Sequence, residues 1–386
     1  MGKEQSRVVV REYDENTDLE KAEALEKSCA VGSLSVDLMG DPLARIRQSP
    51  SFHMLVAEIG YERKEIVGMI RGSIKTVTCG NIAPFHRLQD GGVSPESTKL
   101  AFVSGLRVSP FYRRVGIGLK LVQRLEEWFR RNGAVYAYVQ TESDNDASVK
   151  LFTDKCGYSK FRTPTFLVNP VFNHRVTISR RVTIIRLAPS EAEILYRSRF
   201  SSTEFFPSDI GTILNNKLSL GTFLAVPRGE YSTGSWPESW AVLSVWNSKE
   251  VYRLQVRGTS RFKRTLAKTT RLVDGALPFL KIPSFPDVFR PFSMHFLYGI
   301  GGEGPRAAEM VEALCSHAHN LARKCGCAVV AAEVASCEPL RLGIPHWKVL
   351  SPEDLWCLKR LRHDRDGRDW TTSPPGLSIF VDPREI

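Results

Sequence analysis

The segment from Leu100 to Arg131 constrains the fold more than any other part of this 386-residue chain. The apolar run Leu100–Val108 predicts a strand, and a turn that contains two glycines follows it. After the turn, large apolar residues recur at helical spacing with charged residues between them, until Asn132-Gly133 ends the pattern. A strand that turns directly into an amphipathic helix is the building unit of α/β folds.

Further strands and helices extend this unit in both directions, and the pattern starts again near residue 181. In the first half, strands are predicted over 8–10, 52–59, 65–77, 135–140 and 161–168, and helices over 18–30 and 147–155. In the second half, strands are predicted over 182–187, 239–246, 252–256, 293–300 and 328–334, and helices over 190–200, 306–324 and 353–360. The strands 239–246 and 252–256 are expected to form a hairpin, as 52–59 and 65–77 do around a turn at 60–64. A loop is expected over 79–97. We therefore predict an α/β (α+β) chain of two domains, residues 1–175 and 176–386, related by a duplication with a period of about 190 residues.

Composition excludes several classes of protein. Hydrophobic residues make up 42% and charged residues 25%, as in ordinary globular chains, which excludes a mainly disordered or fibrous protein. The chain has no apolar run of about 18 residues and no signal-peptide core, so no membrane span and no export are expected. The eight cysteines are then expected to be reduced thiols of an intracellular protein, and their spacing matches no metal site. The net charge of +11 favours an anionic partner such as a nucleotide cofactor.

The turn before the predicted helix has the chemistry of an anion-binding site. Its glycines let backbone N–H groups approach an anion, the helix N-terminus adds unpaired N–H groups, and two arginines add positive charge. No Gly-Lys-Ser/Thr follows, which excludes a P-loop, and Leu121 stands where GxGxxG needs its third glycine. The alternative is a plain strand–turn–helix with solvated arginines; the combined features favour a phosphate site. The residues of this turn are Arg113, Arg114, Val115, Gly116, Ile117 and Gly118.

The segment Arg113–Gly118 resembles the Arg/Gln-x-x-Gly-x-Gly/Ala signature of the GNAT superfamily of N-acetyltransferases. The resemblance implies that this turn holds the pyrophosphate of acetyl-CoA. It also implies that the end of the preceding strand splays from its neighbour and pairs its backbone with the pantetheine arm, at Leu106, Arg107 and Val108. A strand N–H group there would polarise the thioester carbonyl.

A second segment resembles the next GNAT motif, Asn-x-x-Ala/Ser…Leu-Tyr/Phe…Gly-Phe/Tyr. It begins at Asn145, which together with Ser148 is implied to contact the cofactor. Phe152 stands where many members place the tyrosine that protonates the departing thiolate, and phenylalanine cannot donate a proton. One extra residue also separates Phe152 from Gly157. Tyr158 is therefore the candidate general acid.

The sequence leaves the general base open. An acceptor lysine, with a pKa of about 10, must lose a proton before it attacks the thioester. The strand Leu100–Leu106 holds no Glu or Asp, so Glu142, just past the strand 135–140, is the candidate base. A water relay, Ser104, or catalysis by positioning alone are the alternatives.

Over its whole length the chain resembles the HOOKLESS group of plant probable N-acetyltransferases. Segments 65–72, 105–114, 203–207 and 298–306 carry this resemblance. It implies a regulator of plant growth linked to hormone response that acetylates a protein, with histones among the candidates. The acceptor itself stays open among a histone tail, another protein lysine, a protein N-terminus and a small amine. The resemblance also implies a location in the nucleus or the cytoplasm.

The second half lacks the anion-binding turn. Its equivalent segment, Gly301–Arg306, carries Glu303 and Pro305 where N–H groups and positive charge are needed. We therefore predict a degenerate GNAT-like domain that binds no CoA and packs on the first domain or shapes the acceptor cleft. The basic stretch Arg253–Arg271 is interpreted as a solvated loop. The core of this half is expected to contain Trp236, Trp240 and Trp246.

Two other functions stay open. Phe152 and the missing strand carboxylate favour a catalytically weak module that binds CoA or a protein and regulates. A nucleic-acid binder rests only on net charge and on Arg253–Arg271, so direct contact with nucleic acid is not expected, and neither is a membrane.

Overall fold

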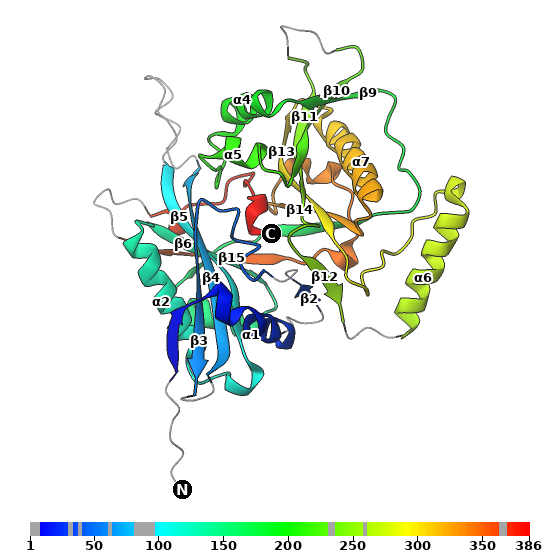
Figure 1. Ribbon diagram of the computed structural model, residues 1–386. Helices are drawn as coiled ribbons and strands as arrows, with labels where there is room; N and C mark the ends of the chain where they lie inside the picture. Colours follow the sequence, from blue (N-terminus) through cyan, green and yellow to red (C-terminus); the bar gives the residue numbers. More distant parts are fainter. Residues whose placement is uncertain are drawn as a thin grey trace, which may run out of the picture.

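The protein folds around two mixed β-sheets that share a core (Figure 1). The computed structural model describes residues 8–29, 34–37, 41–60, 64–80, 97–230, 236–257, 261–362 and 369–386. Residues 61–63 of the predicted turn at 60–64 and most of the predicted loop at 79–97 lie outside these residues. No helix in the described part of the chain is long and apolar enough to cross a bilayer.

The first sheet has the strand order β1-β3-β4-β5-β6-β15-β7. Helix α2 covers one face through the apolar stripe that its sequence predicts, and α1 packs on the other face over β3 and β4. The elements of this part are β1 (Val9–Glu12), α1 (Glu15–Ser28), β3 (Ser51–Ile59), β4 (Glu65–Thr78), β5 (Ser97–Val108), α2 (Ile117–Arg131), β6 (Tyr136–Glu142), α3 (Asp146–Lys150), β7 (Ser159–Arg162) and β15 (Asp354–Arg360).

The second sheet has the order β8-β14-β13-β11-β10-β9. Helix α7 covers its outer face, and the inner face meets α4, α5 and the first sheet. Its elements are β8 (Thr165–Pro170), β9 (Val182–Leu187), α4 (Pro189–Phe200), α5 (Ile210–Leu214), β10 (Ser219–Pro227), β11 (Trp240–Asn247), β13 (Met294–Glu303), α7 (Ala307–Cys325) and β14 (Val329–Val334). A separate two-stranded sheet joins β2 (Leu34–Asp37) to β12 (Arg253–Val256), and α6 spans Arg261–Ala276.

The two sheets repeat one pattern of pairings, which supports the predicted duplication. In each sheet, four strands pair in succession by three antiparallel pairings, and the fourth strand then pairs in parallel with a fifth. The parallel pairs are β5 with β6 and β13 with β14, and an antiparallel strand follows each of them. Helices α2 and α7 form the two parallel crossovers. Equivalent strands also carry the same irregularity, because Gly105 in β5 and Gly299 in β13 have φ values of 59° and 60°. The two halves of the chain are thus built from one topology.

The two halves exchange a strand. The segment predicted as a helix over 353–360 is instead strand β15, which lies between β6 and β7 in the first sheet. The prediction is wrong because Leu355–Leu358 is buried on both faces, and such a short apolar run shows no strand alternation. The single strand predicted over 161–168 is two strands, of which β8 joins the second sheet beside β14. The division at residue 175 stays a prediction.

Three further expectations for the second half need correction. Strand β10 is absent from the prediction, and the expected hairpin of β11 with β12 does not form. Strand β11 pairs with β10 and β13, whereas β12 pairs with β2 in a separate sheet. The basic stretch Arg253–Arg271 is not a loop but forms β12 and most of α6. Trp240 and Trp246 are core residues as expected, but Trp236 is 50% exposed.

Candidate functional site

Strand β5 leaves its neighbour β6 halfway along its length. The two strands pair in parallel only from Leu100 to Val103, while β6 continues beside β15 as far as Glu142. The register between β4 and β5 shifts at this point, where Gly105 takes a left-handed conformation. A Cβ atom there would overlap the guanidinium of Arg71, so the position requires glycine. The bulge bends β5 and opens its backbone toward a ligand on the β6 side.

The last residues of β5 contribute backbone rather than side chains to this opening. Leu106 and Val108 are partly buried against the core under α2. The Arg107 guanidinium forms an ion pair with Glu26 of α1 at 3.3 Å and donates to the Leu106 carbonyl at 3.1 Å. Its charge is therefore engaged within the fold. A backbone role for these three residues toward a cofactor stays a prediction.

The turn into α2 is open to solvent. Arg113, Arg114, Val115 and Gly116 are exposed, and Arg114 and Gly116 have φ values of 63° and 86°. No side chain caps the helix, which begins at the buried Ile117, so its first N–H groups face outward. A Cβ atom at Gly116 would meet nothing within 4 Å. A pyrophosphate fits here, because bare N–H groups, a helix N-terminus and two arginines surround free space.

The second predicted motif lies beside this turn. A Cβ atom at Gly118 would be 3.4 Å from Leu151, which follows α3. Asn145 caps α3, and its Oδ1 accepts from the Ser148 N–H at 3.3 Å, so both groups are used inside the chain. Residues Leu151–Lys155 form a π-helical turn. A π turn contains one residue more than an α turn, which explains the extra residue in the motif.

Tyr158 lies in the core under α2. Its ring makes an edge contact with Phe152, with centroids 5.3 Å apart, and the Lys359 ammonium lies 5.5 Å from its ring centroid. Burial raises the pKa of its phenol well above the usual value. Tyr136 and Tyr138 face the other core, between the sheets, so strand alternation places Glu142 on that side. The structure therefore does not bring Tyr158 and Glu142 together.

Glu142 instead meets two carboxyl groups that the sequence reasoning missed. Asp354 of β15 is its cross-strand partner, and Glu333 reaches the same place from β14. The Glu333 Oε1 atom accepts from the Trp356 indole N–H at 2.9 Å. Burial raises the pKa of Asp354 to about 7, helped by the charge of Glu142, and raises the pKa of Glu333 well above its usual range. Burial and the charge of Asp144 also raise the pKa of Glu142.

Several polar atoms around this place are buried and have no hydrogen-bond partner among the described residues. Such atoms are rare in folded proteins, and they concentrate where a ligand or water completes the bonding. They include Ser104 Oγ, Gln140 Nε2 and Glu385 Oε1.

Comparison with known proteins identifies the family. Residues 19–158 match the model of the acetyltransferase (GNAT) family. The chain is 64% identical to "Probable N-acetyltransferase HLS1" of Arabidopsis thaliana, over 98% of this chain and 100% of that protein. It is 39% identical to "Acetyl transferase GW6a" of Oryza sativa subsp. japonica, over 98% and 97%. The chain belongs to the GNAT acetyltransferases, in their HOOKLESS group.

Solved structures of the same architecture support the GNAT fold over both halves. Saccharomyces cerevisiae N-myristoyltransferase with bound myristoyl-CoA has a TM-score of 0.56 at 10% identity, over 93% of this chain and 80% of that chain. A GCN5-related N-acetyltransferase from Sphaerobacter thermophilus has a TM-score of 0.51 at 12% identity, over 95% and 98%. The family uses an acyl-CoA and an amine acceptor, and this GNAT chain is an enzyme of that class.

The second GNAT-like sheet closes the turn that the first leaves open. A Cβ atom at Gly304, before α7, would overlap the Glu238 carbonyl oxygen, and the Arg306 N–H donates to Ser239 Oγ at 3.2 Å. Glu303 forms an ion pair with Arg199 at 3.4 Å. The chain's own groups thus fill the space that an anion would need.

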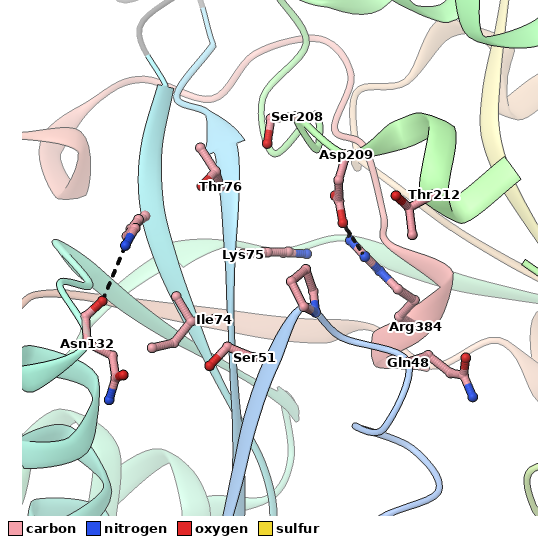
Figure 2. Close-up of a pocket in the computed structure, with 12 residues that line it drawn as sticks. Gln48, Ser51, Ile74, Lys75, Thr76, Asn132, Ser208, Asp209, Thr212 and Arg384 are labelled. Carbon is pink, nitrogen blue, oxygen red and sulfur yellow. Dashed lines mark hydrogen bonds and ion pairs between the residues drawn. The ribbon is translucent and has the colours of Figure 1, made fainter. Parts of the chain in front are cut away.

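A pocket of about 500 Å³ lies away from the predicted cofactor turn Arg113–Gly118 (Figure 2). Its lining includes Lys99 of β5 and Asn132, which follows the C-terminal end of α2, whereas the turn precedes the N-terminal end of the same helix. Arg384 and Asp209 form an ion pair on its wall. The pocket is therefore not part of the predicted cofactor site.

Proposed function

We propose that this enzyme transfers the acetyl group of acetyl-CoA to an amine, with a protein lysine as the acceptor. The observation that carries the proposal is the open, uncapped N-terminus of α2 beside the strand end that splays from β6. The pyrophosphate would bind the N–H groups of Arg113–Gly118, and the pantetheine arm would pair with the backbone of Leu106–Val108. An N–H group at that strand end would stabilise the charge that develops on the thioester oxygen.

Proton transfer would involve Glu142 and Tyr158, the two candidates from the sequence, or groups beside them. Glu142 lies at the end of β6, beyond the point where β5 leaves it, and burial raises its pKa, which makes its carboxylate a stronger base. Tyr158 keeps its proton at neutral pH, but its buried position under α2 leaves its role as an acid without support from the geometry. The carboxyl groups near Glu142 favour a cationic acceptor such as lysine over a neutral one, despite the net charge of the chain.

We also propose that the enzyme acts in plant growth control linked to hormone response, in the nucleus, on histone or other protein lysines. The plant relatives in its group support a role in plant growth, whereas the nucleus, the hormone response and the histone acceptor rest on the HOOKLESS resemblance of the sequence. The alternative is a regulatory module that binds CoA or a protein with little turnover, which the phenylalanine at position 152 favours.

The test is isothermal titration of acetyl-CoA into the wild type and the Arg113→Ala/Gly116→Glu double variant. We expect saturable wild-type binding that the variant loses. The Arg306→Ala/Gly326→Glu variant is the matched control, because Gly326 is also left-handed and open at its Cβ position, and it should bind as the wild type does. A wild type that binds no acetyl-CoA contradicts the proposal, and binding without turnover on any amine supports the regulatory alternative.

A further inference from the structure

We infer that the two halves of the chain together build the proton acceptor of the reaction, as a carboxyl pair formed by Asp354 on β15 and Glu333 on β14. The second half is then part of the active site and not only a support for the first. This inference rests on the proposed acetyl transfer.

Strand positions bring the pair to the place where β5 and β6 separate. Asp354 is the cross-strand partner of Glu142, on the part of β6 that β5 has left. Trp356 lies two residues further along β15 and belongs to the core between the sheets, so Asp354 faces the same side. The Trp356 indole holds Glu333 at 2.9 Å, and the Glu333 carboxyl hydrogen-bonds to Asp354.

Polar atoms beside the pair have no partner within the described ranges. Glu333 is only 4% exposed, and its carboxyl group is held by the Trp356 indole and by Asp354. Ser104 Oγ and Gln140 Nε2, on the two strands that separate, are buried and unsatisfied, and Gln140 is the cross-strand partner of Trp356. Buried polar atoms without a partner are unfavourable, so they indicate a polar ligand between these strands, and the acceptor amine is such a ligand.

The charges around the pair are mostly negative. Glu142 faces Asp354 from β6, with Asp144 just beyond it, and Glu385 faces Glu333 from the C-terminal segment. The groups around Glu385 are the Lys75 ammonium at 2.6 Å, the Tyr138 hydroxyl and the Asp382 carboxylate. Lys75 thus neutralises Glu385, while no described cation forms an ion pair with Asp354 or Glu333. The pair therefore shares one proton near neutral pH, and Asp354 carries the free negative charge.

This arrangement performs the transfer with a closed proton balance. The substrate ammonium gives one proton to the Asp354 carboxylate, and the neutral amine then donates its lone pair to the thioester carbonyl carbon. A C–N bond forms and the C–S bond breaks, with the electron pair leaving on the thiolate. The new amide nitrogen loses a second proton. One of the two protons ends on the thiol, and the other is released to solvent.

The experiment measures two quantities on the full chain across a pH series. Difference infrared spectroscopy follows the protonated carboxyl band without any substrate, and thiol release from acetyl-CoA follows turnover with water or poly-L-lysine as acceptor. We expect the wild-type rate to rise with pH through about 7, as the Asp354 carboxyl loses its proton. Asp354→Asn should remove both this rise and the matching infrared titration, and should slow thiol release about 100-fold or more.

Substitutions of Glu142 and Glu333 should move the pH midpoint of the rate in opposite directions. Glu142→Gln removes a negative charge beside Asp354 and should lower the midpoint, whereas Glu333→Leu removes a hydrogen bond that stabilises the Asp354 carboxylate and should raise it. Glu333→Gln keeps the Trp356 bond and a donor, so it tests the same position with the fold conserved and should leave the midpoint in place. Glu303→Gln, a remote carboxyl of the second half, is the matched control.

The outcomes separate the two proposals. A wild type that neither binds nor cleaves acetyl-CoA overturns the proposed function. A wild type that releases thiol with a pH profile that Asp354→Asn, Glu142→Gln and Glu333→Leu leave unchanged overturns this inference alone. A structural role for Asp354 would lower stability and rate at every pH without moving the midpoint.

Discussion

Replacing either of two glycines at equivalent turns by alanine should have different effects on acetyl-CoA affinity and on stability. Gly116 and Gly304 precede α2 and α7 with φ values of 86° and 91°. In Gly116→Ala, the left-handed conformation costs about 1–2 kcal/mol, and the less flexible unfolded chain offsets about 0.4–1 kcal/mol. The free energy of unfolding should therefore fall by about 1 kcal/mol. The new methyl group enters open space in front of the helix N–H groups, where we place the pyrophosphate.

Gly304→Ala has the same backbone cost and a collision in addition. Its Cβ atom would overlap the Glu238 carbonyl oxygen and lie 2.7 Å from the Ser239 Cα atom. Both are backbone atoms directly before β11, and they can move only together with the start of that strand. Overpacking of this kind costs about 1–3 kcal/mol, so the total loss should be about 2–4 kcal/mol.

Gly116→Ala should thus lose mainly affinity for acetyl-CoA, and Gly304→Ala mainly stability. Isothermal titration should show acetyl-CoA binding weakened about 10-fold or more in Gly116→Ala, because each charge-assisted hydrogen bond contributes about 1.5–3 kcal/mol. Gly304→Ala should bind normally but unfold at clearly lower urea. Gly229→Ala is the control, since Gly229 is also left-handed with open space at its Cβ position. Equal loss of affinity in Gly116→Ala and Gly304→Ala would refute the assignment of the anion site to α2 alone.

Three further perturbations test the packing. His295 is fully buried with both ring nitrogens unpartnered among the described residues, and burial lowers its pKa to about 4. Its folded pKa lies below the unfolded value of about 6.5, so stability is lost as pH falls from 6.5 to 4, and His295→Phe should reduce this loss in urea denaturation. Asp274→Ala breaks the 2.6 Å contact with His174 that fastens α6, so amide exchange in α6 should rise while exchange in α7 stays slow. Arg384→Met leaves the buried Asp382 carboxylate without its 2.7 Å partner, and calorimetry should show a loss of about 3–5 kcal/mol.

Local patterns predicted the strand, the turn and the helix around Arg113–Gly118 because these parts are contiguous in the chain. Strand β5, the turn and α2 occupy one stretch of chain, and each part carries its own signal: an apolar run, two glycines and an amphipathic stripe. The left-handed Gly116 and the uncapped start of α2 follow from residues at those positions alone. The strand bulge at Gly105 was not foreseen, since it depends on the Arg71 side chain of a neighbouring strand.

The carboxyl cluster could not be predicted in the same way. Glu142 was found because it follows a strand of the same domain, but Asp354 and Glu333 lie about 200 residues further along the chain. Asp354 sat in a segment whose continuous apolar run favours helix and strand equally. Only the pairing of β15 with β6 places it opposite Glu142, and no local pattern encodes that pairing.

The strand exchange makes the two halves one functional unit. Without β15, strand β6 would lose its partner beyond Val139, and Asp354 would leave the site with it. Without β8, strand β14 would lose its outer partner and the support for Glu333. A plain duplication would have given two independent sheets, each able to keep or lose a cofactor turn. Here each sheet needs a strand from the other half. The second half can therefore lose its own turn and still be retained, because the first half needs β15 to complete the proposed acceptor site.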